Sequence, residues 1–367
     1  MRADLMNRLI IIFTILLANT VTSFSQNTIW KHLGRSSGIP DSNYIYNYER
    51  DIIGRVYYSR KNTGFNCAAP DNATSFSYKP NNSKGIGLGL SYRYLTLNLQ
   101  FGLLGRDESK GETSSFDFQT NIYKKQWVYD FVIQTYKGMY LTPKGYNTSD
   151  GSYYIRPDIR TTLVGGDFWR IMNSDRFSYR AVMTQNDWQV KSAGSVLLGA
   201  EIYYGVTSGD KPLIPDSASK HYTSFQRGID NVKLFRIGPG IGYAYTLVLN
   251  KNFFLSGGIT ANYDFAYSRE LSDTASRGKI AMSPNITYRI GIGYNNRRWN
   301  INASLVDNSV IARSATVAEN YKIFNQSFRI TVAYRYTPTR KLKNRVLSPL
   351  DDNLDKVERT IKGTPNK

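Results

Sequence analysis

The chain has 367 residues, of which 47 are Lys or Arg and 28 are Asp or Glu, giving a formal net charge of +19. Nucleic-acid-binding proteins gather such an excess on one patch beside base-stacking aromatics; here the basic residues are scattered, so we expect no nucleic-acid partner. The single cysteine, Cys67, excludes an internal disulfide framework, and 28 Tyr beside 29 Gly favour a β-rich exported protein over a helical one.

Residues 1–25 have the features of a secretory signal peptide. Arg2 and Arg8 precede the apolar run "LIIIFTILLA", and small residues lie before Gln26. A membrane-spanning helix needs about 20 apolar residues, so this run is too short to be an anchor. Residues 26–51 are then expected to form an N-terminal periplasmic segment. No later window has an apolar run of helical spanning length, so the mature chain can cross a membrane only as a closed barrel.

Apolar and polar residues alternate in many segments, which predicts β-strands with one apolar face. The first strand is expected in "IIGRVYYSRK" with "TGFNCAA". Hairpins are expected for "GIGLGLSY" with "YLTLNLQFGLL", "SFDFQTNI" with "WVYDFVIQT", "RTTLVGGDFW" with "RFSYRAVM", "IGPGIGYAYTLVL" with "FFLSGGITANYDFAY", and "NITYRIGIGY" with "WNINASL". "SFRITVAYRYT" is the last predicted strand.

The long polar segments between these hairpins are predicted to be extracellular loops, namely 105–112, 138–157, 207–232, 270–278 and 314–324. Short turns that alternate with long loops are typical of outer-membrane barrels. The strand directions fail to alternate once between residues 190 and 235, where a strand is missed or a turn misplaced. We therefore predict an all-β transmembrane antiparallel barrel over residues 52–337, with about 12 strands and a range of 12–14.

The two strand faces differ in charge, which decides the face toward lipid. The apolar faces are rich in Tyr, Phe and Trp near strand ends, as aromatic girdles require. The polar faces carry full charges, so we expect them to face the lumen. The charged residues assigned to the lumen are Arg93, Arg160, Arg180, Arg289, Arg329 and Arg335, with Asp117, Asp130, Glu201 and Asp264. Residues 338–367 are expected to be a disordered basic periplasmic tail, with both termini periplasmic.

Several stretches are more specific than this alternation. "YKPNNSKGIGLGLSY" and "KSAGSVLLG" resemble an uncharacterised exported family of Bacteroidota, domain of unknown function 4421, over roughly residues 50–337. The resemblance implies an outer-membrane β-barrel in a Gram-negative bacterium of that phylum. It implies no activity.

An outer-membrane hydrolase would need a Ser nucleophile with a His base within hydrogen-bond reach. Only His32 and His221 are present, and His221 lies in a long predicted loop beside Asp216, Ser217 and Ser219. Adjacent residues on one loop rarely form a triad, so we expect no enzyme. Two His and one Cys exclude the usual zinc sets. We expect no cofactor and no metal site, with one alternative left open, which is calcium bound by carboxylates of the loops.

The stretch "QNDWQVKSAGS", residues 185–195, is the best candidate for a ligand site. The alternative that we favour is a structural lumen network with Glu201 and Arg180. The candidate side chains in the stretch are those of Gln185, Asn186, Gln189, Lys191 and Ser192.

The expected function is a structural or transport component with a narrow or plugged polar lumen. The inward charges include more Arg than acidic residues, so a passive anion-preferring pore is the second hypothesis, and an outer-membrane lipid hydrolase is the third. The expected partners are outer-membrane lipid, the barrel-assembly machinery during biogenesis, and an unidentified protein or solute.

Overall fold

The computed structural model describes residues 39–67, 76–81, 84–93, 95–102, 107–316, 320–342, 344, 347–349 and 351–352. The chain divides into two compact units, Ser36–Tyr336 and the two termini. In the terminal unit, Arg340–Leu342 form the short helix α5. The predicted signal peptide and most of the predicted tail lie outside the described residues. None of the described helices is long and apolar enough to cross a membrane.

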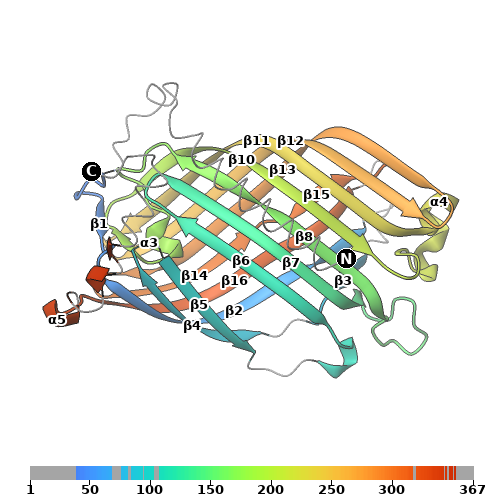
Figure 1. Ribbon diagram of the computed structural model, residues 1–367, viewed down its shortest axis with the longest axis horizontal. Coiled ribbons are helices and arrows are strands. Elements are labelled where there is room, and N and C mark those ends of the chain that lie inside the picture. The colour runs from blue at the N-terminus through green and yellow to red at the C-terminus, as the bar shows by residue number, and fades with distance from the viewer. Residues whose placement is uncertain are drawn as a thin grey trace. The chain divides into compact units, whose positions relative to one another are not determined.

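The unit Ser36–Tyr336 is built from antiparallel strands (Figure 1). In chain order the strands are β1 (Ile45–Asn47), β2 (Ile52–Cys67), β3 (Phe76–Lys79), β4 (Gly85–Tyr92), β5 (Leu95–Gly102), β6 (Ser114–Tyr123), β7 (Trp127–Thr142), β8 (Ile155–Ile171), β9 (Asp187–Gln189), β10 (Ala193–Ser208), β11 (Ile229–Leu249), β12 (Phe253–Ser272), β13 (Ser276–Asn295), β14 (Trp299–Asp307), β15 (Val310–Arg313) and β16 (Asn320–Tyr336). The helices are η3 (Glu108–Lys110), α3 (Arg180–Met183), η4 (Asp216–His221) and α4 (Ser224–Arg227).

The sheet closes on itself because β2 pairs with β16. Among the described residues, ten strands form the closed ring, in the order β2, β3, β7, β8, β10, β11, β12, β13, β14 and β16. The hairpin β4–β5 is added to β2, and β6 is added to β7. β3 is a bridge of only four residues. If it is left out, the nine other ring strands and the three added strands β4, β5 and β6 number twelve. The prediction of a membrane-type antiparallel barrel is confirmed, but the closed ring among the described residues has ten strands, whereas about 12 were predicted.

The alternating faces are oriented as the sequence predicts. On β12, Ile259 is 55% exposed on the outer surface, whereas the next residue, Thr260, is 2% exposed and faces inward. Aromatic pairs lie at the end of the barrel where β11 turns into β12 and β13 into β14. There Phe253 packs on Tyr294, and Trp299 packs on Tyr334. Apolar outer faces with an aromatic girdle are the surface of a barrel embedded in lipid.

One predicted hairpin is wrong. The segment "RFSYRAVM", residues 176–183, is not a strand; it includes helix α3, and β8 pairs directly with β10 instead. In a half-buried strand only alternate residues are buried, but here Phe177, Ser178 and Tyr179 are all buried. The segment is enclosed on every side, so its alternation is accidental. With β10 in place of this strand, the strand directions alternate correctly between residues 190 and 235.

The strands also run further than predicted. Segment 207–232 was expected to be a loop, but β10 extends to Ser208 and β11 begins at Ile229. Likewise β7 continues to Thr142 and β8 begins at Ile155. Polar outward residues at these strand ends do not show the apolar alternation, although their backbones remain paired in the sheet.

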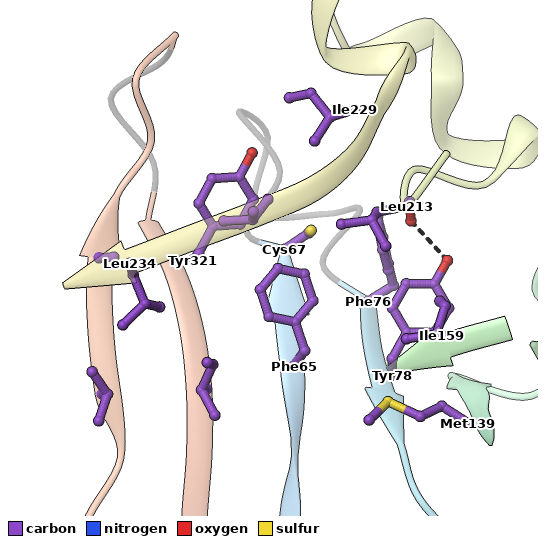
Figure 2. Close-up of a cluster of buried hydrophobic side chains, with 14 of the residues drawn as sticks. Phe65, Cys67, Phe76, Tyr78, Met139, Ile159, Leu213, Ile229, Leu234 and Tyr321 are labelled. Atoms are coloured by element: carbon purple, nitrogen blue, oxygen red, sulfur yellow. Dashed lines mark hydrogen bonds between the residues drawn. The ribbon is translucent and has the colours of Figure 1, made fainter. Parts of the chain in front are cut away.

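An apolar cluster fills the barrel at the end opposite the aromatic girdle. It combines inward side chains of several strands with residues of the segment between β10 and β11 (Figure 2). Tyr78 donates a hydrogen bond to the Leu213 carbonyl over 2.7 Å, which joins β3 to that segment. Cys67 is buried in the same cluster. We call these residues the apolar cap.

Candidate functional site in the barrel interior

The middle of the barrel contains a buried ion pair between β11 and β12. The Arg236 guanidinium donates to Asp264 Oδ2 from Nε at 2.9 Å and from Nη2 at 2.7 Å, and neither side chain is exposed. Beside it, Glu201 accepts hydrogen bonds from Asn262 at 2.7 Å and Asn285 at 2.8 Å. Glu201 and Asp264 were predicted to face the lumen, but Arg236 was missed, because the predicted strand begins at Ile237, eight residues after the start of β11.

A second ion pair crosses the lumen. Arg289 of β13 contacts Asp130 of β7, although these strands are not neighbours in the ring. Asp167 lies 3.6 Å from the same guanidinium and accepts hydrogen bonds from Trp169 at 2.7 Å and from the Tyr203 hydroxyl at 3.1 Å. Contacts across the ring occupy the space that an axial channel would need. Asp167 was missed because two glycines precede it in "LVGGDFW" and hide the alternation.

A third ion pair lies nearer the apolar cap. Lys61 Nζ is 2.6 Å from Asp117 Oδ2, and the Tyr136 hydroxyl donates to the same carboxylate. Gln119 reaches from β6 to Asn325 of β16 over 3.2 Å. Asp117 is therefore an interior residue, as the sequence predicted.

Residues 172–192, between β8 and β10, fold into the girdle end of the barrel, and we call them the plug segment. Within it β9 pairs with β1, so part of the predicted N-terminal periplasmic segment belongs to the same structure. Asn300 of β14 donates to the Ala181 carbonyl over 3.1 Å. Packing and backbone hydrogen bonds therefore tie this segment to the wall.

Arg335 of β16 is the main anchor of the plug segment. Its guanidinium donates to the carbonyls of Gln185 at 2.8 Å and Asp187 at 3.0 Å, and to the Asn296 carbonyl at 2.5 Å. It also lies 4.6 Å from the centre of the Tyr48 ring. Burial raises the pKa of Tyr48, and the Arg335 charge opposes that rise, so the phenol stays neutral beside the cation.

The candidate residues of 185–192 are mostly structural parts of the plug segment. Gln185, Asn186 and Gln189 are buried. Lys191 is exposed and lies 5.5 Å from the Tyr44 ring, whereas the Ser192 hydroxyl accepts a 2.8 Å hydrogen bond from the Val248 amide. The network with Arg180 is present, because this guanidinium lies 3.7 Å from both Asp187 and Glu49. Glu201 belongs to the mid-barrel network instead.

Two predicted lumen residues lie elsewhere. Arg160 faces outward and is exposed, because Ile159 and Thr161 are the inward residues of that part of β8. It lies directly opposite Lys137 of β7, at a level where the outer face is already polar, and there alternation cannot identify the inner face. Arg93 occupies the turn after β4 with a φ of 54° and so lies on neither face.

The inner face of β4 is a glycine tract on which β2 side chains lie. A Cβ on Gly87 would overlap the Tyr57 ring, and one on Gly89 would overlap the stem of Arg55. The glycines therefore make room for large inward side chains. Tyr57 in turn packs under Arg329, whose guanidinium carbon is 4.4 Å from the ring centre.

We expect Gly87→Val to lower the free energy of unfolding by about 1–3 kcal/mol, because the new side chain displaces the buried Tyr57 ring. Gly257→Val is the matched control, because a Cβ there meets nothing within 4 Å. Urea unfolding in detergent micelles measures both. Restoration of stability by an added Tyr57→Ala would support the stated cause, and equal loss at Gly257 would refute it.

The described residues contain no group of three or more His, Cys, Asp or Glu that could hold a metal ion. His221 is the last residue of η4, and His32 lies outside the described residues.

A family model, Domain of unknown function (DUF4421), matches residues 39–336. The chain belongs to this family. No curated protein matches the DUF4421 chain. Among solved structures, it is similar to the outer membrane protease OmpT from Escherichia coli, with 8% identity, a TM-score of 0.34, and coverage of 79% of this chain and 98% of that one. It is also similar to OprG from Pseudomonas aeruginosa, with 12% identity, a TM-score of 0.21, and coverage of 80% and 98%. Such low TM-scores carry no argument about function.

Proposed function

We propose that this DUF4421 protein is an outer-membrane barrel whose lumen is closed to passive flow, acting as a structural or transport component. The observation that carries the proposal is the filling of the interior at three levels. The plug segment occupies one end, the Arg289–Asp130 contact crosses the middle, and the apolar cap occupies the other end.

The outer surface supports the location. The outward side chains of β11, β12 and β13 are apolar over most of their length, and an Arg or Lys in such a band is costly. In bacterial barrels the short turns are periplasmic. The turns after β6, β11 and β13 are short and share the end that holds the plug segment, so we infer that the plug segment and β1 lie on the periplasmic side.

The alternative of an anion-preferring pore has less support. It rested on an excess of inward Arg, but Arg160 faces outward, and Arg180 and Arg289 lie beside carboxylates. Arg335 is occupied by backbone carbonyls. Arg180, Arg289 and Arg335 thus hold the structure together rather than line a water-filled path. We propose no enzymatic activity.

The anchor of the plug segment gives a test. Arg335→Gln removes charged hydrogen bonds worth about 1.5–3 kcal/mol each, so we expect the plug segment to become cleavable by added protease in folded, detergent-solubilised protein. The matched control is Arg298→Gln, which removes an exposed charge from the turn after β13 at the same end of the barrel.

Swelling of protein-loaded liposomes in small neutral sugars should be absent for the native protein. Swelling of native-protein liposomes would refute the closed lumen, and equal cleavage of both variants would refute Arg335 as the anchor of the plug segment.

A further inference from the structure

Two interior arginines differ from the other charged groups of the barrel. Arg236, Arg289, Arg180 and Lys61 each lie within 4 Å of a carboxylate. Among the described residues, no carboxylate lies within that distance of Arg55 of β2, or of Arg329 and Arg335 of β16. Arg335 is instead bound by backbone carbonyls, which leaves Arg55 and Arg329.

Arg55 is 5% exposed, and its Nη2 donates to Ser91 Oγ at 2.5 Å and to the Thr184 carbonyl at 3.0 Å. Its buried Nε has no hydrogen-bond partner. Arg329 lies over the Tyr57 ring and is close enough to Arg55 for the two charges to repel each other. Arg55 is buried and Arg329 is half-buried, and no carboxylate of the described residues lies beside either charge. A buried cation without an anion is costly, so this place in the fold favours a bound negative group.

The wall beside these arginines is not paired throughout. In the described part of the chain, β5 pairs only with β4 and β6 only with β7. The bridge β3 joins β2 to β7 nearer the apolar cap, so the unpaired edges of β5 and β6 lie on the girdle side of β3. Backbone edges left unpaired at membrane depth require a polar partner or water.

The strand β5 is also exposed on both faces. Its outward residues Leu97, Leu99 and Phe101 are exposed, and so are the lumen-side residues Asn98 and Gln100. An apolar outer surface therefore continues around one strand edge onto a polar inner surface that leads to Arg55. The Arg55 stem and the Asn98 amide both approach Gly89.

We propose that Arg55 and Arg329 bind the anionic headgroup of an amphiphile that enters laterally between β5 and β6, with its apolar chain left in the lipid. The proposal rests on the proposed function, because a lumen closed at both ends leaves the side wall as the route to these arginines. The class of ligand is a phosphate- or carboxylate-bearing amphiphile, since a guanidinium pair recognises either group.

The test uses the full chain in dodecyl maltoside, with dodecyl phosphate as the probe and calorimetric titration as the measurement. Arg329→Gln should weaken binding at least about tenfold, because it removes one charged contact. Arg60→Gln is the matched control, because Arg60 lies on β2 but is exposed on the outer face. It should leave binding unchanged. Heat-modifiable migration on gels verifies that each variant is folded.

A second variant does not alter either arginine. Asn98→Asp adds a negative charge at an exposed position beside Arg55, so it should weaken dodecyl phosphate binding by a similar factor. Full binding by both Arg329→Gln and Asn98→Asp would overturn the site. Inorganic phosphate that binds as tightly as dodecyl phosphate would overturn lateral uptake of an amphiphile. A conducting native barrel with binding intact would refute the closed lumen and leave the anion site standing.

Discussion

Asp264→Ala is expected to lower the free energy of unfolding by about 3–5 kcal/mol, because it leaves the Arg236 charge buried without its partner. The guanidinium would keep the Ser283 contacts, at 3.0 Å to the carbonyl and 3.5 Å to the hydroxyl, and Glu201 Oε1 at 4.0 Å, but it would lose both of its hydrogen bonds to a carboxylate. Equilibrium unfolding in urea, with the protein refolded into phospholipid vesicles, measures the loss.

The control for this prediction replaces both partners. Arg236→Met with Asp264→Leu removes the hydrogen-bonded pair together and should cost far less than Asp264→Ala alone, because no guanidinium is left without its carboxylate and Glu201 keeps its two asparagine donors. A double variant as unstable as the single one would show that the ion pair has been assigned the wrong role.

Ile259→Arg is expected to lower the free energy of unfolding by about 2–4 kcal/mol, because it places a charge in the outward apolar band of β12. Thr274→Arg, at the exposed tip between β12 and β13, is the matched control and should change little. The same vesicle unfolding experiment compares them. Equal stability of the two variants would mean that the outer face of β12 does not contact lipid.

The hairpins were predictable because their evidence is local. In β12, each residue from Phe253 to Tyr267 alternates between lipid and interior, and the short turn at 250–252 separates it from β11. Alternation of apolar and polar residues does not identify a strand where both faces of a segment are buried. The plug segment is buried all around, so its apolar and polar residues gave a false strand at 176–183.

The sequence predicts which residues face the interior, but it does not predict which of them contact each other. Asp130 and Arg289 were both assigned inward, but their contact depends on how the ring closes, and closure through β2 and β16 has no local signal. Arg160 was misplaced because the outer face of β8 is polar at that height. Arg55 was missed because "GRVYYSR" alternates weakly on its outer side, where Gly54 and Tyr58 are only half-buried.

Single-channel conductance in a planar lipid bilayer tests the closed lumen most directly. The purified native protein should give no stable current steps. A variant with residues 173–191 replaced by a short Gly-Ser turn should give small or brief steps, because the mid-barrel ion pairs and the apolar cap still restrict the lumen. Stable, reproducible steps from the native protein would contradict the account.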